Sequence, residues 1–127
     1  ELTQFMKGVY VLFHLAAMAR VQPSIEQPIP YHDANVTATH NLLVAAADAG
    51  VKRFVFSSSS SVYGNAKVPT SETHELNPMS PYALHKLIGE QYCKLYSFLF
   101  QFLQLKLKKA NLVLSIMMVI KEEIIHL

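Results

Sequence analysis

Residues 53–64 read Arg-Phe-Val-Phe-Ser-Ser-Ser-Ser-Ser-Val-Tyr-Gly, an apolar run that leads directly into five consecutive serines. A short apolar run bounded by turn residues is typical of a buried strand, and residues 9–14 form another such run. Between them, residues 32–49 carry apolar side chains at helical spacing, and Gly50 closes the segment. Strand, helix and strand in this order predict an α/β fold, with a right-handed βαβ crossover and parallel strands buried on both faces.

The segments around this unit have less regular patterns. Three prolines predict a loop at residues 16–30, and repeated turn residues predict another at residues 58–79. The expected elements are a helix end at residues 2–7, loops at residues 16–30 and 58–79, a helix from Pro81 to beyond Tyr96, and a strand at residues 112–120. We therefore expect a domain of residues 1–97 and a divergent tail of residues 98–127, which contains a helix end and one strand.

Tyr82 and Lys86 carry the chemistry that this arrangement suggests. They follow Ser80-Pro81, which predicts a helix start with serine at the N-cap, and four-residue spacing places both on one helix face. A nearby ammonium favours the phenolate of a tyrosine, which can then take a proton from a substrate hydroxyl. A serine at the end of the preceding strand would hold the substrate oxygen by donating and accepting hydrogen bonds.

Composition excludes several classes of protein. With 127 residues, 51% hydrophobic and 16% charged, the chain is long and apolar enough for one globular domain. A net charge of +2 is too small to predict a nucleic-acid partner. The six histidines have no spacing typical of a metal site. We therefore expect no metal and no nucleic acid.

The single cysteine and the absence of long apolar runs indicate a location. Cys93 cannot form an internal disulfide, and we interpret it as a packing residue on the same helix as Tyr82. No apolar run reaches the roughly 18–20 residues that a membrane span needs, and the first residues show no signal peptide. A cytoplasmic protein with no membrane partner is expected.

Four motifs together resemble one enzyme family. They are Val-Leu-Phe-His-Leu-Ala-Ala at residues 11–17, Asn35-Val36-x-x-Thr39, the serine run that ends in Val62-Tyr63-Gly64, and Ser80-Pro81-Tyr82-Ala83-Leu84-His85-Lys86. They resemble the extended short-chain dehydrogenase/reductase family, and within it the NAD-dependent sugar-nucleotide epimerases and dehydratases, closest to the UDP-glucose 4-epimerase type. The resemblance runs from about residue 8 to about residue 97. It implies a Rossmann-like parallel sheet with flanking helices.

The resemblance also implies an activity and a set of catalytic residues. The activity is inversion at C4 of a nucleotide-sugar such as UDP-glucose or UDP-galactose, by removal and return of a hydride with NAD as cofactor. Tyr82 is the implied base and Lys86 the cation that activates it. Ser59 is the residue implied to bind the reacting hydroxyl, with its neighbours Ser58 and Ser60 as alternatives if the alignment is displaced by one residue. The intact enzymes of the family are homodimers.

Further positions match the family's cofactor-binding and substrate-binding segments. The cofactor-binding residues implied are Ala16, Ala17, Met18, Asn35, Ser57, Tyr82 and Lys86. Ala16 and Ala17 are small enough to let a ribose approach, and Asn35 resembles a helix asparagine that positions a water or backbone group near the lysine. Val21, with Ser59 and Tyr82, is expected at the substrate, and Arg20 at the edge of that pocket.

Two alternatives stay open. Dehydratases of the family carry Thr-Asp-Glu before Val-Tyr-Gly, where this chain has Ser59-Ser60-Ser61, so the residues favour an epimerase over a dehydratase or reductase. The chain also lacks the glycine-rich turn that binds the pyrophosphate, which implies that the amino-terminal, glycine-rich half of the fold is missing. A non-catalytic truncated fragment is therefore the second hypothesis.

Overall fold

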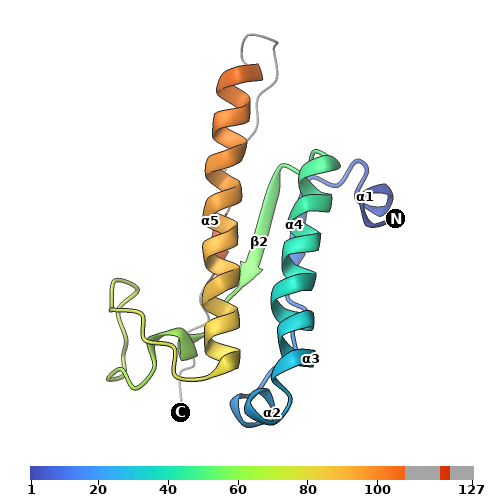
Figure 1. Ribbon diagram of the computed structural model, residues 1–127. Coiled ribbons are helices and arrows are strands. Elements are labelled where there is room, and N and C mark those ends of the chain that lie inside the picture. Colours follow the sequence, from blue (N-terminus) through green and yellow to red (C-terminus); the bar gives the residue numbers. More distant parts are fainter. Residues whose placement is uncertain (108–117, 121–127) are drawn as a thin grey trace.

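The computed structural model describes residues 1–107 and 118–120, which form a parallel sheet with helices packed along it (Figure 1). The strand order is β1-β2-β3, where β1 is Val11–His14, β2 is Arg53–Ser57 and β3 is Met118–Ile120. β2 pairs in parallel with both neighbours, so that His14 lies opposite Phe56 and Ser57 opposite Ile120. The α/β class and the parallel sheet predicted from the sequence are confirmed.

The helices bring distant parts of the chain to one edge of this sheet. They are α1 (Leu2–Phe5), α2 (Val21–Glu26), α3 (Pro28–His32), α4 (Ala38–Asp48) and α5 (Pro81–Leu107), with a π-helical turn η1 (Asp33–Thr37) and a 3₁₀ turn η2 (Ser60–Tyr63). In Figure 1, α4 and α5 run beside β2, and the arrowhead of β2 points toward the end where α5 begins. α2 and α3 lie at the same end. In open α/β sheets, ligands bind at the carboxyl edge of the strands.

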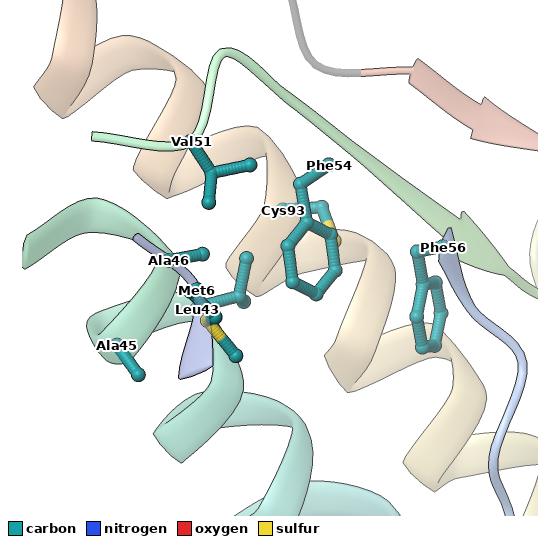
Figure 2. Close-up of a cluster of buried hydrophobic side chains, with 8 residues drawn as sticks. All are labelled: Met6, Leu43, Ala45, Ala46, Val51, Phe54, Phe56 and Cys93. Carbon is teal, nitrogen blue, oxygen red and sulfur yellow. The ribbon is translucent and has the colours of Figure 1, made fainter. Parts of the chain in front are cut away.

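The core lies between β2 and the two long helices. Phe54 and Phe56 project from β2 toward α4 and α5, where they meet Leu43 and Cys93 (Figure 2). Leu43 and Cys93 are each 1% exposed and Phe56 is 2% exposed. The remaining members of this cluster are Met6, Ala45, Ala46 and Val51. β2 is buried on both faces, as predicted, because Val55 on its other face is also buried.

The prediction that β1 is buried on both faces is wrong. His14 points into the core, but Phe13, its neighbour on the opposite face, is 65% exposed. Tyr10 and Leu15 on either side of the strand are also exposed. β1 is an edge strand of the described sheet, and the exposure of Phe13 shows that one of its faces is uncovered. The apolar run predicts a strand correctly, but it does not show which face is covered.

The loop predicted at residues 16–30 is also wrong in part, because α2 and most of α3 lie within it. The three prolines that suggested a loop occupy early helical positions. Pro23 is the third residue of α2, while Pro28 and Pro30 are the first and third of α3. The first amide groups of a helix have no intrahelical partner, so a proline there costs no hydrogen bond. The segment 58–79 is irregular as predicted, except for η2.

The remaining expectations differ from the structure mainly at their boundaries. The helix predicted at residues 32–49 is η1 followed by α4, and Gly50 after it has φ +73°, as a helix-terminating glycine requires. The strand predicted at residues 112–120 is found at β3, and residues 112–117 lie outside the described residues. α5 continues past residue 97 without a break, so the domain division there stays a prediction. Among the helices of residues 1–107, none is long and apolar enough to span a bilayer.

Candidate active site

Lys86 joins α5 to the end of β2. Its ammonium donates a hydrogen bond to the Ser57 carbonyl at 2.7 Å, and the residue is 4% exposed. The ammonium also lies 5.1 Å from the centre of the Phe56 ring, within the range of a cation–π interaction. A buried cation requires such partners, because its desolvation is costly. The carboxyl end of β2 therefore holds Lys86 in place.

Tyr82 lies one turn before Lys86, on the same face of α5. The centre of its ring is 6.0 Å from the Lys86 ammonium, and the side chain is half-buried. Ser80 caps the helix as predicted, because its Oγ accepts a hydrogen bond from the Ala83 amide at 3.1 Å. The structure thus places the phenol and the ammonium on one helix face, at the edge where β2 ends.

Ser24 positions Tyr82 from a second element, and sequence reasoning missed it. Its hydroxyl donates to the Val21 carbonyl at 2.5 Å and accepts from the Tyr82 amide at 3.1 Å. Ser24 is completely buried, whereas the Val21 side chain is 44% exposed at the start of α2. The contact was hidden because residues 16–30 were expected to be a loop. The Ser24 hydroxyl therefore connects the backbones of Val21 and Tyr82. The role of Val21 at a substrate stays a prediction.

The three serines after Phe56 have different environments. The carbonyl of Ser57 accepts from Lys86, and the buried Ser58 donates its hydroxyl to Glu90 Oε1 at 2.5 Å. Ser59 is half-buried at the N-cap of η2. Its Oγ accepts from the Ser61 amide at 3.2 Å and from the Ser61 hydroxyl at 2.9 Å. Ser59 thus differs from Ser58, whose hydroxyl is buried and bonded to α5.

Asn35 holds the segment that follows β1. Its Oδ1 accepts from the Met18 amide at 2.8 Å, and its Nδ2 donates to the Met18 carbonyl at 2.9 Å. This two-way pairing fixes the backbone beside Ala16 and Ala17, which are both exposed. Asn35 lies in the π-helical turn η1, and such turns occur frequently at functional sites. Asn35 thus pairs with the Met18 backbone, and its roles toward the lysine and a cofactor stay predictions.

Arg20, expected at the edge of a substrate pocket, has an unusual backbone. Its φ is +84°, the one positive value among the non-glycine residues that the structure describes. It is exposed and immediately precedes α2. Tyr31 fixes the neighbouring backbone by donating its hydroxyl to the Ala19 carbonyl at 2.6 Å. The chain therefore turns sharply between Met18 and α2.

His14 is buried at the end of β1 and is held as a neutral imidazole. The Thr39 hydroxyl donates to the Asn35 carbonyl at 2.7 Å, so its oxygen accepts the hydrogen bond from His14 Nε2–H at 2.8 Å. Burial lowers the pKa of His14 below 6.5, and the positive charge of Lys86 lowers it further. His14 therefore links β1 to α4 without adding a charge near Lys86.

This lowered pKa predicts that the chain loses stability in mild acid. The unfolded His14 takes up a proton near pH 6.5, whereas the folded imidazole resists it, so the unfolded state binds more protons as the pH falls. The contribution is fully present above pH 6.5 and is lost as the pH falls toward the lower pKa of the folded state. Urea unfolding from about pH 8 to pH 5 should show this decrease.

A control variant separates His14 from other groups. His85 also has a lowered pKa, through burial and the nearby His32, so it adds to the same slope. His14→Gln should make the free energy of unfolding less dependent on pH in this window. An unchanged slope in that variant would show that His14 is not the group responsible.

Cys93, on α5, lies in surroundings that make its thiol unreactive. Burial raises the pKa of Cys93 to about 12, and the neighbouring carboxylate of Glu90 contributes to the increase. Because the thiolate is the reactive form, alkylation by iodoacetamide at pH 8 should be at least about a thousandfold slower in the native chain than in guanidinium chloride. Mass spectrometry measures both rates. Rapid alkylation of the native chain would contradict the packing role.

Gly89 and Glu90, which sequence reasoning missed, also lie against the end of β2. A Cβ atom at Gly89 would be 2.4 Å from Phe56 Cζ, so only glycine allows α5 to approach the ring this closely. Glu90 is 1% exposed and receives the Ser58 hydroxyl. The spacing of Tyr82, Lys86 and Glu90, each four residues apart, was a signal that all three share one face.

The carboxyl edge of the sheet has features that fit the nicotinamide end of NAD. Exposed alanines follow β1, and the ammonium of Lys86 lies at the end of β2. Hydrogen bonds fix the backbone of Met18 after β1 and that of Ser57 at the end of β2.

Residues 1–97, whose side chains the structure describes, contain no group of three or more potential metal ligands.

Comparison with known proteins decides the family. The family model described as "NAD dependent epimerase/dehydratase family" matches residues 1–109 of the 127-residue chain. The chain belongs to this family. Among curated relatives, the uncharacterized UDP-glucose epimerase YtcB of Bacillus subtilis is 41% identical to this chain over 97 residues. The match covers 76% of this chain and 31% of the relative.

Solved structures show the same fold in two kinds of enzyme. The UDP-glucose 4-epimerase of Brucella ovis in complex with NAD has a TM-score of 0.75 and 33% identity, over 79% of this chain and 32% of that one. DesIV of Streptomyces venezuelae, a dTDP-glucose 4,6-dehydratase with NAD bound, has a TM-score of 0.74 and 34% identity, over 79% and 31%. The chain therefore spans about a third of the length of the relatives it matches, and its similarity to these two structures is nearly equal.

Proposed function

We propose that this chain provides the reactive part of a nucleotide-sugar epimerase that inverts C4 of a substrate such as UDP-glucose or UDP-galactose. The observation that carries the proposal is the hydrogen bond between Lys86 and the Ser57 carbonyl, which fixes α5 against the end of β2. Tyr82 lies one turn earlier on the same face of α5, with its ring centre 6.0 Å from the Lys86 ammonium. The relatives' names and the NAD bound in neighbouring structures support the substrate class and the cofactor.

Each residue has a role that follows from its position. Tyr82 accepts the proton of the C4 hydroxyl as a phenolate and returns it as a phenol. Lys86 supplies a positive charge on the same helix face from a fixed position. Ser59, at the N-cap of η2, holds the C4 oxygen by hydrogen bonding. NAD, when bound, supplies the acceptor and donor of the hydride at C4.

The serine run favours epimerisation over elimination of water. Dehydration at a sugar needs an additional acid and base, and Ser59, Ser60 and Ser61 supply none at the positions before Val62. The carboxylate bonded to the serine run, that of Glu90, is 1% exposed and accepts the Ser58 hydroxyl, so it is poorly placed to reach a substrate. Inversion requires only oxidation and reduction at one carbon, for which a serine is sufficient.

A chimaera tests this function in a protein of the relatives' length. In it, the matching segment of the Brucella ovis enzyme is replaced by the corresponding residues of this chain, which cover about a third of that enzyme. Proton NMR with UDP-galactose and NAD should show UDP-glucose as the product. A chimaera that folds and binds NAD but yields a 4-keto-6-deoxy sugar from dTDP-glucose, and no C4 inversion, would favour the dehydratase.

The chain alone tests the alternative of a non-catalytic fragment. Isothermal titration with NAD should show no binding in the micromolar range, because residues 1–107 show no glycine-rich turn to hold the pyrophosphate. Micromolar affinity would mean that the chain itself forms a cofactor site. Light scattering on the same sample shows whether the purified chain is a single species.

A further inference from the structure

Two neighbouring residues at the end of β2 are bonded to α5 one helical turn apart. The Ser57 carbonyl accepts from Lys86 at 2.7 Å, and the Ser58 hydroxyl donates to Glu90 Oε1 at 2.5 Å. Lys86 and Glu90 are four residues apart and therefore share a helix face. The strand end is thus attached to α5 at two points, one through its backbone and one through a side chain.

The packing between these two points leaves little freedom. Gly89 precedes Glu90, and the Phe56 ring occupies the space that a side chain at Gly89 would need. Phe56, Ser58 and Glu90 are 2%, 3% and 1% exposed. A shift of the strand along α5 would break the two hydrogen bonds and move the ring against the helix backbone.

A buried carboxylate is a costly way to fill a core. Taking its charge out of water requires strong hydrogen bonds to compensate, and an apolar side chain of similar volume is often as stable. Hydrogen bonds to a carboxylate are short and directional. The hydroxyl of Ser58 gives Glu90 such a bond, and the next residue along the chain is Ser59.

We propose that Glu90 is a positioning residue that sets the register of the serine run against α5, so that the Ser59 hydroxyl faces the space beside Tyr82. Glu90 itself touches no substrate and acts through Ser58. The structural part of this inference stands on the contacts above, and its catalytic meaning rests on the proposed function. Ser61 provides a reporter, because its amide donates to Ser59 Oγ at 3.2 Å.

The test measures amide exchange at Ser61 by NMR in the 127-residue chain. Glu90→Ala and Ser58→Ala should each accelerate that exchange at least about tenfold, and the double variant should add little, since both remove the same bond. Glu90→Gln should remain near the wild type, because its amide oxygen can accept the Ser58 hydroxyl. Cys93→Ala is the matched control, since it removes a buried group from the next turn of α5 and should leave Ser61 unchanged.

Each outcome supports or overturns the proposal. Equal Ser61 exchange in Glu90→Ala, Ser58→Ala and Cys93→Ala would overturn it, as would a Glu90→Gln variant that behaves like Glu90→Ala. If Glu90→Ala does not fold, Ser58→Ala, which removes a single hydroxyl from the same bond, decides the result alone. The chimaera adds a catalytic readout, in which Glu90→Ala should lower kcat at least about tenfold with KM changed less than about threefold, and Glu90→Gln should restore it.

The exchange measurement in the chain and the kinetic measurement in the chimaera together separate this inference from the proposed function. Coupling of Glu90 to Ser61 in the chain, together with a folded, NAD-binding but inactive chimaera, would end the proposed function and leave the positioning contact standing. An active chimaera that tolerates Glu90→Ala would end this inference and leave the proposed function standing.

Discussion

Tyr82→Phe in the chimaera is expected to reduce C4 inversion by about 10²–10⁴-fold, the usual contribution of a positioned general acid or base. The substitution removes one oxygen and keeps the ring whose centre lies 6.0 Å from the Lys86 ammonium. The backbone contact from Ser24 to the Tyr82 amide is unaffected, so the start of α5 should be unchanged. Proton NMR of the UDP-galactose and UDP-glucose anomeric signals measures the rate.

Tyr92→Phe provides the matched control for this prediction. It makes the same chemical change on the same helix, at a ring that stacks on His40 with centres 4.5 Å apart, away from the serine run. This control should retain activity within about threefold and should bind NAD as the unsubstituted chimaera does. Similar rates for Tyr82→Phe and Tyr92→Phe would show that the Tyr82 phenol does not move the proton.

Phe56→Ala is expected to destabilise the chain by about 3–5 kcal/mol, as is typical when a buried phenylalanine is truncated. The ring packs against Gly89, lies 5.1 Å from the Lys86 ammonium and contacts the His14 ring. Its removal leaves a cavity between β2 and α5, and the ammonium loses a neighbour. Urea unfolding monitored by circular dichroism measures the change in the free energy of unfolding.

Phe13→Ala tests the same substitution on β1, where the ring is 65% exposed. Its effect should stay within about 0.5 kcal/mol, as for surface substitutions in general. A loss comparable to that of Phe56→Ala would mean that the outer face of β1 is covered in solution. The pair of variants therefore tests the assignment of the two faces of the sheet.

The central βαβ unit could be predicted because its signals are local. The apolar run before the serines gives β2, the glycine after residue 49 ends the helix, and Ser80 with Pro81 starts α5. Four-residue spacing then correctly places Tyr82 and Lys86 on one face, as the 6.0 Å between the Tyr82 ring centre and the Lys86 ammonium shows. These inferences depend on neighbours in sequence and on periodicity, which an isolated chain displays.

The rest depends on contacts between distant residues, which the sequence does not display. Ser24 and Tyr82 are 58 residues apart, and the Ser58–Glu90 pair spans 32 residues. The prolines of α2 and α3 suggested a loop because proline disfavours helix interiors, whereas tertiary packing places them in first turns. Exposure of Phe13 depends on which elements cover β1, and an apolar run alone does not reveal this.

Deuterium at C4 gives the most direct test of the central claim, that Tyr82, Lys86 and Ser59 serve the removal and return of a hydride at one carbon. The chimaera is incubated with UDP-[4-²H]galactose and NAD, and the product is analysed by NMR and mass spectrometry. The expected product is UDP-glucose that retains deuterium at C4. Loss of the label to water, or an NAD-binding chimaera that forms no UDP-glucose, would contradict the claim.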